Sequence, residues 1–154
     1  MKLTVASSPH IRGNFRTNRI MLDVVLSLIP ALLVGTFVLG FNSLVLTVMS
    51  MAAAIVTEWL YSVVTKTRNT VIDGSAAVTG MLIAFNVPSG LPLWIAILGC
   101  FIAVIIVKQL YGGIGKNLVN PAITARIVLF ISFATEMTTW PLPKALQADA
   151  VTGP

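Results

Sequence analysis

The sequence has 154 residues, of which 56% are hydrophobic and only 10% are charged, and its formal net charge is +5. Soluble domains carry roughly a quarter charged residues, so this chain has too few charges to cover a globule of its size. The composition excludes an ordinary soluble enzyme, a disordered segment and a DNA-binding domain. We expect an all-α, polytopic helical membrane protein with about five transmembrane segments and no nucleic-acid partner, because basic residues in such a chain report its topology.

The first two predicted spans are long and continuous. A polar, basic segment covers residues 1–19, and the apolar run over residues 20–41 is about 33 Å long as a helix, enough to cross a bilayer. No cleavage signal follows this run, so we expect a retained span and not a signal peptide. A short Asn42-Ser43 break then separates it from the second predicted span, residues 44–64.

The remaining three predicted spans cover about residues 71–88, 91–108 and 117–136, within a transmembrane domain of residues 20–140. The first and last of these three are short or broken, with glycine and polar residues before each apolar core. Irregular backbone at membrane depth persists only where protein or a cavity satisfies it, which favours two broken helices around a central site. The alternative is a pair of ordinary spans with frayed ends. Residues 141–154 form an extracytoplasmic tail in this scheme.

Positive charge is distributed unevenly between the predicted loops. With the N-terminus inside and five spans, the cytoplasmic pieces hold eight of the ten basic residues, whereas Lys144 lies outside and Arg126 within the fifth span. The eight are Lys2, Arg12, Arg16, Arg19, Lys66, Arg68, Lys108 and Lys116. Because cytoplasmic loops carry an excess of Lys and Arg, this pattern predicts a cytoplasmic N-terminus, five crossings and an exported C-terminus.

Six short motifs occur along the chain in order. They are Ser8-Pro9-His10, Asp23-Val24-Val25-Leu26, Asp73-Gly74-Ser75-Ala76-Ala77-Val78-Thr79-Gly80, Lys108-Gln109-Leu110-Tyr111-Gly112-Gly113-Ile114-Gly115, Asn120-Pro121-Ala122 and Met137-Thr138-Thr139-Trp140. As a set, this order and spacing resemble the D subunit of the Rnf complex, the ion-translocating ferredoxin:NAD+ oxidoreductase of bacteria. The B subunit of the sodium-pumping NADH:quinone reductase is a related family. The resemblance covers essentially the whole chain.

This resemblance implies a cofactor and a longer parent architecture. The family has two repeats in an arrangement similar to that of urea transporters, and the chain then corresponds to the first repeat. The family also carries FMN on a threonine of the motif Asp-x-x-Ser/Thr-Gly-Ala-Thr/Ser, and riboflavin is a second candidate cofactor. Asp149, Thr152 and Gly153 match this motif, but Pro154 replaces its alanine and the acceptor position would come next. We therefore expect a truncated product or a fragment without covalent flavin.

Ionisable side chains inside a span cost about 3 kcal/mol or more at its centre, so each of them needs a reason. Glu58 either pairs within the bundle, lines an ion path or extends to the interface. Asp73 precedes a helix start and is interpreted as an N-cap, with a flavin or ion role as the alternative. Arg126 must face protein, water or an anion, and its alternatives are a flavin phosphate or ring carbonyl and an acidic partner, Glu58 or Asp73.

Two asparagines at helix ends complete the candidate site. Asn120 precedes Pro121 and is expected to cap the fifth helix, because proline suits the first helical turn. Asn86 lies where the third helix ends. Either amide could instead contact a flavin ring. With one His and one Cys in the chain, we expect no metal site, and no catalytic residue is predicted.

The resemblance implies a membrane subunit of an electron-transfer complex that couples ferredoxin and NAD redox chemistry to Na+ or H+ export and holds flavin in the membrane. Such a protein is not catalytic alone. Its expected partners are the A, B, C, E and G subunits of the Rnf complex and the lipid bilayer, and its expected location is the bacterial cytoplasmic (inner) membrane, as a multi-pass protein. Two alternatives stay open: half of a small-solute channel or transporter, and a truncated assembly subunit without a redox role.

Overall fold

The computed structural model describes residues 17–66 and 71–143, and the regular structure in these two ranges is entirely helical. The elements, in chain order, are α1 (Thr17–Leu39), α2 (Phe41–Thr65), the 3₁₀ helix η1 (Val71–Asp73), α3 (Ser75–Phe85), α4 (Leu93–Phe101), the π-helix η2 (Ile102–Gln109), α5 (Pro121–Ser132) and α6 (Ala134–Thr138). The all-α prediction is therefore confirmed.

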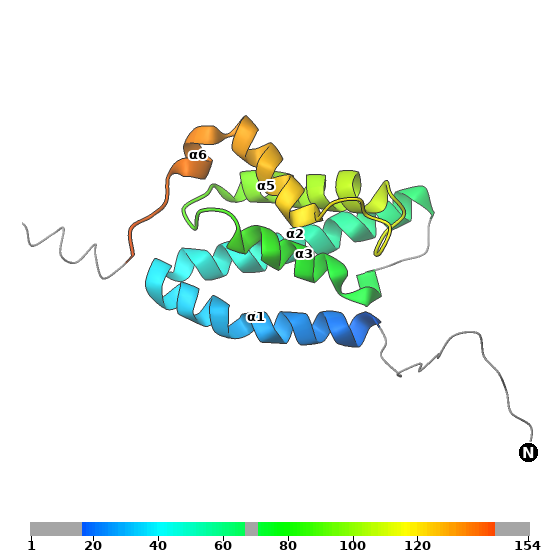
Figure 1. Ribbon diagram of the computed structural model, residues 1–154, viewed down its shortest axis with the longest axis horizontal. Helices are drawn as coiled ribbons and strands as arrows, with labels where there is room; N and C mark the ends of the chain where they lie inside the picture. Colours follow the sequence, from blue (N-terminus) through cyan, green and yellow to red (C-terminus); the bar gives the residue numbers. More distant parts are fainter. Residues whose placement is uncertain (1–16, 67–70, 144–154) are drawn as a thin grey trace, which may run out of the picture.

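Successive apolar segments run in alternating directions between the two ends of the molecule (Figure 1). The start of α1 and the ends of α2 and η2 lie at one end, whereas the α1–α2 turn, the 86–92 loop and α6 lie at the other (Figure 1). By length and composition, α1 and α2 are long and apolar enough to cross a membrane, and α3, α4 with η2, and α5 are shorter apolar helices. This arrangement agrees with a polytopic membrane protein, and the exact span boundaries stay a prediction.

The break between α1 and α2 falls at Gly40, so the predicted break at Asn42-Ser43 is wrong. α1 ends at Leu39 and α2 begins at Phe41, and Gly40 between them has a φ of 100°. Glycine adopts this conformation without steric cost because it has no Cβ, so one residue suffices to separate the two helices. Asn42 and Ser43 instead lie in the first turn of α2, where the N–H of Ser43 donates to the carbonyl oxygen of Gly40 at 3.1 Å.

The helices α3 and α5 are short. They contain 11 and 12 residues, which correspond to about 16 and 18 Å of helix. The hydrocarbon core of a bilayer is roughly 30 Å thick, so neither helix crosses it by itself. The glycine, proline and polar residues beside them predict this shortening, and α5 begins inside the bundle, near the middle of its length (Figure 1).

The most extensive helix packing in the described part of the chain is between α2 and α3. A Cβ added to Gly80 would lie only 2.5 Å from the carbonyl oxygen of Ser50 and 2.8 Å from the Cα of Met51. Ala76, one turn earlier on α3, is also buried. Small residues four apart let two helix backbones approach closely, and Ala76 and Gly80 form such a pair on α3.

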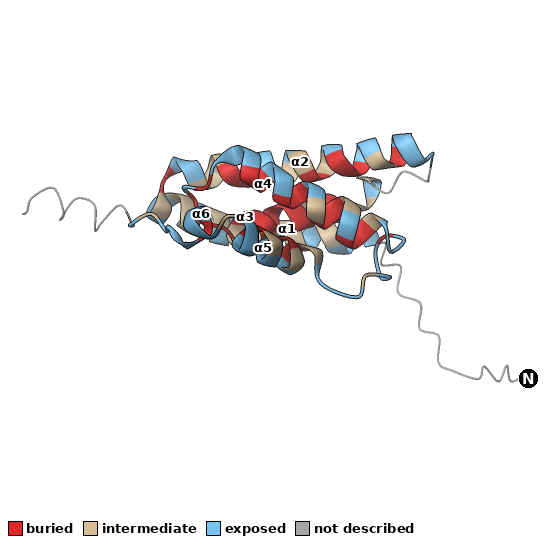
Figure 2. Cartoon of the chain, turned by 90° about the horizontal axis from the view of Figure 1, so that it is seen from above, coloured by how far each residue is buried: buried red, intermediate tan, exposed pale blue. Residues whose placement is uncertain are grey.

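Buried residues line the inner faces of α2, α4, η2 and α5, whose outer faces carry exposed residues, whereas no residue of α3 is exposed (Figure 2). In α1 no residue is buried, and many of its exposed side chains are large and apolar. Contiguous apolar surface of this kind is rare on soluble monomers. It suits an exterior that faces lipid or other membrane proteins.

Candidate functional site

A buried polar cluster joins α2, α3 and η2. The ammonium Nζ of Lys108 lies 2.7 Å from Oε1 of Glu58 and donates to Oγ of Ser75 at 2.6 Å. The amide Nε2 of Gln109 donates to the same Glu58 oxygen at 2.7 Å. The side chains of Lys108 and Glu58 are 2% and 0% exposed, so this ion pair is enclosed by protein.

The four members of this cluster come from three helices, α2, α3 and η2. Glu58 lies seven residues before the end of α2, which places it about 10 Å along the helix from that end. Ser75 is the first residue of α3. Lys108 and Gln109 are the last two residues of the π-helix, and although they are consecutive, both reach the same carboxylate oxygen. π-helical segments are rare and often occur at functional sites.

The prediction that Lys108 belongs to a cytoplasmic loop is wrong. The helical segment extends through Gln109, and Glu58 supplies a counter-charge that lets the lysine lie inside the bundle. The charge pattern that supports a cytoplasmic N-terminus therefore rests on seven of the eight basic residues counted. The interpretation that Glu58 extends to the interface is wrong for the same reason, because its carboxylate is engaged in the bundle.

A second polar contact links α5 to the end of α3. Nη1 of Arg126 donates to Oδ1 of Asn86 at 3.4 Å. Nδ2 of Asn86 donates to the carbonyl oxygen of Leu82 at 2.7 Å, which turns the amide oxygen toward the guanidinium. Within residues 17–66 and 71–143 no carboxylate pairs with Arg126, so the alternative of a Glu58 or Asp73 partner is wrong.

Apart from Asn86, the surroundings of Arg126 on α5 are apolar, which is unusual for a guanidinium. Arg126 is exposed on α5, and the neighbouring exposed side chains Ile123, Ile127 and Phe130 are apolar. A lone arginine facing lipid is costly, so this face of α5 requires a polar neighbour. Two of the predicted flavin-contacting residues, Arg126 and Asn86, are thus brought together across 40 positions of sequence.

Asn120 caps α5 as predicted. Its side-chain oxygen accepts from the backbone N–H groups of Ala122 at 3.0 Å and Ile123 at 3.5 Å, and Pro121 occupies the first turn. These bonds satisfy donors that have no intrahelical acceptor, so a structural role accounts for Asn120. A flavin contact of this residue stays a prediction.

Asp73 does not cap α3. It ends the 3₁₀ turn η1, and the N-cap position belongs to Gly74, which has a φ of 72° and makes no side-chain capping bond. The extra 3₁₀ turn shifts the helix start by one residue, which takes Asp73 out of the capping register. The N-cap interpretation is wrong, and the flavin or ion role of this half-buried acid stays a prediction.

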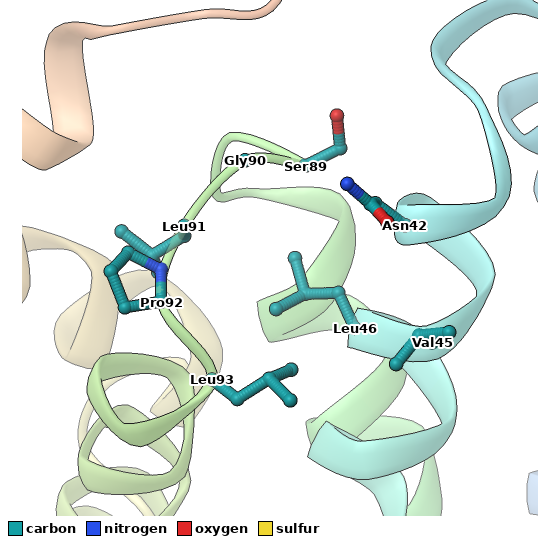
Figure 3. Close-up of a pocket in the computed structure, with 8 residues that line it drawn as sticks. All are labelled: Asn42, Val45, Leu46, Ser89, Gly90, Leu91, Pro92 and Leu93. Carbon is teal, nitrogen blue, oxygen red and sulfur yellow. The ribbon is translucent and has the colours of Figure 1, made fainter.

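A cavity of about 250 Å³ lies between the 86–92 loop and the start of α2 (Figure 3). It is lined by Asn42, Val45, Leu46, Ser89, Gly90, Leu91, Pro92 and Leu93. The Ser89 hydroxyl is buried and has no hydrogen-bond partner in the described part of the chain. None of the predicted site residues lines this cavity, so it is distinct from the Glu58 cluster and the Arg126 contact.

The remaining predicted site residues, Asp149, Thr152 and Gly153, lie outside the described residues. Within the described ranges, no group of three or more His, Cys, Asp or Glu side chains could hold a metal ion. Sequence reasoning missed three members of the buried cluster, namely Ser75, Lys108 and Gln109. A lysine at the end of one apolar run and a glutamate inside another were the available signal, but nothing local indicates that they meet.

Comparisons with known proteins bear on the identity of this chain. The family model described as "NQR2, RnfD, RnfE family" matches residues 4–154. The chain is 43% identical over 139 residues to the D subunit of the Na(+)-translocating ferredoxin:NAD(+) oxidoreductase complex of Acetobacterium woodii, covering 90% of this chain and 44% of that protein. It is 39% identical over 149 residues to the D subunit of the proton-translocating ferredoxin:NAD(+) oxidoreductase complex of Clostridium ljungdahlii, covering 97% of this chain and 45% of that protein.

A third relative, the D subunit of the ion-translocating oxidoreductase complex of Shewanella sediminis, is 37% identical over 156 residues, covering 98% of this chain and 44% of that protein. The chain thus spans less than half the length of the curated relatives that it matches. The family match covers nearly all of the chain, and the resemblance of its six sequence motifs to the Rnf D subunit is confirmed. The chain belongs to the NQR2, RnfD, RnfE family.

Proposed function

We propose that this chain acts as a membrane subunit of an ion-translocating ferredoxin:NAD+ oxidoreductase complex, and that its own part is to hold a flavin, FMN or riboflavin, in the membrane. The names of its relatives support the complex, and the polar contact on α5 supports the flavin. When bound, a flavin supplies the redox chemistry, and the protein supplies binding, orientation and electrostatics.

The observation that carries this proposal is the Arg126–Asn86 contact. Asn86 takes one N–H of the guanidinium, and the planar fork has four further N–H donors. A fork of this kind recognises a phosphate or a pair of carbonyl oxygens with more than one hydrogen bond. The apolar side chains around Arg126 on α5 would exclude water and pack against an aromatic ring system.

The partners and the location follow from the same proposal. We expect the chain to assemble with the A, B, C, E and G subunits of an Rnf complex in the bacterial cytoplasmic membrane, with its N-terminus in the cytoplasm. The Acetobacterium relative is named for Na+ and the Clostridium relative for protons, so either ion is a candidate for coupling. Glu58 is the candidate ion-path residue, because it is the buried carboxylate of the described helices.

The flavin contact is tested with Arg126→Lys and Arg126→Ala in the purified full complex. An ammonium cannot replace the planar fork, so both variants should lose noncovalent flavin, measured by its absorbance after denaturation, while the complex still assembles. Arg19→Lys, which changes an exposed arginine on α1, is the matched control and should keep its flavin. Normal flavin content in both Arg126 variants would refute this role.

Covalent attachment needs a separate test, because the motif Asp149, Thr152 and Gly153 is incomplete. The chain as it stands should show no flavin fluorescence on a denaturing gel when a flavin transferase is present. A chain in which Ala-Thr replaces Pro154 should gain the mass of one FMN moiety, and one in which Ala-Ala replaces it should not. Attachment to the unextended chain would point to Thr152 as the acceptor and would refute the proposed register.

A further inference from the structure

The buried cluster has the composition of a site for a monovalent cation. Two oxygen atoms, Oε1 of Glu58 and Oγ of Ser75, converge on one positive group at 2.7 and 2.6 Å. The carboxylate contributes one negative charge, and the group that it holds carries one positive charge. The surrounding protein excludes solvent, since the two charged side chains are 0% and 2% exposed.

The occupant of these oxygens is the ammonium of Lys108, which is itself a tethered monovalent cation. We propose that the Glu58–Ser75 oxygen pair is a monovalent-cation site, that Lys108 fills it in this conformation, and that a small cation from solution can take its place once the ammonium withdraws. This inference deepens the ion-path role proposed for Glu58, and it does not depend on the flavin.

The position of the pair in the fold favours this assignment. Ser75 is the first residue of the short helix α3, and Lys108 and Gln109 end an irregular helix. In membrane transporters, sites for coupling ions are typically built at the ends of discontinuous helices. Ionisable groups inside a membrane bundle are rare and mark ion and proton paths, whereas a buried ion pair is weak evidence for added stability.

The π-helix offers a way for the ammonium to withdraw without stranding the carboxylate. Gln109 already donates to Oε1 of Glu58 at the same distance, 2.7 Å, as Lys108. When Lys108 leaves, that oxygen therefore keeps one donor. A π-helical turn holds one extra residue relative to an α-helix, so its relaxation would rotate Lys108 away while the neutral amide of Gln109 remains near Glu58.

The test removes the tethered cation from the purified full chain. Lys108→Ala keeps the Cβ and frees the space of a propylammonium group. Thermal unfolding is measured in detergent at constant ionic strength with sodium, ammonium or propylammonium replacing choline in steps, and with choline alone. We expect the midpoint of Lys108→Ala to rise by several degrees, increasingly with concentration, in at least one of the first three salts relative to choline. The wild type should unfold at the same midpoint in all four salts.

Three variants separate a cation site from a general salt effect. Glu58→Gln combined with Lys108→Ala removes the negative charge and should abolish the cation-dependent rise. Ser75→Ala combined with Lys108→Ala should reduce it. Lys116→Ala, which removes an exposed lysine from the loop after η2, should behave as the wild type. The salt that produces the rise distinguishes sodium from ammonium-type cations as the preferred occupant.

Equal midpoints of folded Lys108→Ala in all four salts would refute the proposal, as would a rise that persists in the double variant lacking the Glu58 carboxylate. Should Lys108→Ala not fold in choline, Lys108→Ser is measured in the same way, and failure of both to fold in every salt also counts against the proposal. Flavin content is the readout for the proposed function, so the two can fail separately.

Discussion

The substitution Gly80→Ala tests whether backbone contact between α2 and α3 positions both polar sites. α3 carries Ser75 at its start and Asn86 at its end, so a displacement of this helix affects the Glu58 cluster and the Arg126 contact together. The new Cβ would lie 2.5 Å from the carbonyl oxygen of Ser50, whereas ordinary contact begins at 3.4 Å. The two helices must therefore separate by most of that difference.

The size of the effect follows from which atoms are in the way. Overpacking of a well-packed core costs about 1–3 kcal/mol. Around Gly80 the three nearest atoms all belong to the backbone of α2, which cannot move aside as a side-chain end can, so the upper part of this range applies. Alanine regains about 1 kcal/mol of helix propensity over glycine. The net loss in the free energy of unfolding is therefore expected to be about 1–2 kcal/mol.

Unfolding by SDS titration in mixed micelles, followed by circular dichroism, measures this loss. Gly99→Ala is the matched control, because Gly99 is also helical but its Cβ would meet the Cδ1 of Leu129, the end of a flexible side chain, at 2.7 Å. For Gly99→Ala, the gain in helix propensity should roughly balance the packing cost, which is smaller than that of Gly80→Ala. The reasoning would be refuted if Gly80→Ala were as stable as the wild type or more stable than Gly99→Ala.

Three further predictions concern the ion pair, the α5 cap and the topology. Glu58→Gln and Lys108→Met should each lower the free energy of unfolding by about 3–5 kcal/mol, because each leaves one buried charge without its partner. The double variant should recover most of the lost stability, since neither charge is then buried. Additive losses in SDS titrations would contradict this. Asn120→Ala should cost about 1 kcal/mol and Asn120→Ser much less, measured in the same way, since serine also caps helices; equal losses in both variants would count against the capping role. On a background lacking the native cysteine, Gly90→Cys should react with an impermeant thiol reagent added outside intact cells and Ile114→Cys should not; the reverse labelling would overturn the proposed orientation.

Local signals in the sequence were sufficient for the class of fold and for several helix ends. The shortage of charged residues requires apolar surface, and the structure has that surface along α1. Asn120 caps α5 because its short amide reaches the N–H groups two and three residues ahead, which depends on neighbouring residues alone. The small residues Ala76 and Gly80, four positions apart, are likewise a local pattern typical of close helix packing, and α2 is the helix that approaches Gly80.

Local signals failed where two or more residues compete for the same role. Gly40 and Asn42-Ser43 were both able to separate the first two helices, and the glycine does so because it alone takes a φ of 100° freely. Asp73 has the side chain of a good N-cap, but the 3₁₀ turn leaves that position to Gly74. The exact residue at which a helix begins or ends thus depends on how the whole helix packs against its neighbours.

The sequence by itself determined that this is an all-helical protein with an apolar exterior. The apolar exterior follows from the composition of the chain, and helix capping depends on residues only a few positions apart. Only the tertiary structure decided which charges meet. Lys108 and Glu58 are 50 positions apart and Arg126 and Asn86 are 40 apart, so no spacing rule links them. The crossing of α2 and α3 and the irregular end of η2 bring Lys108 and Glu58 together. Lys108, which the charge pattern assigned to a loop, is therefore the buried partner of the Glu58 carboxylate. A charged side chain is stable inside a bundle that excludes water only where an opposite charge lies beside it.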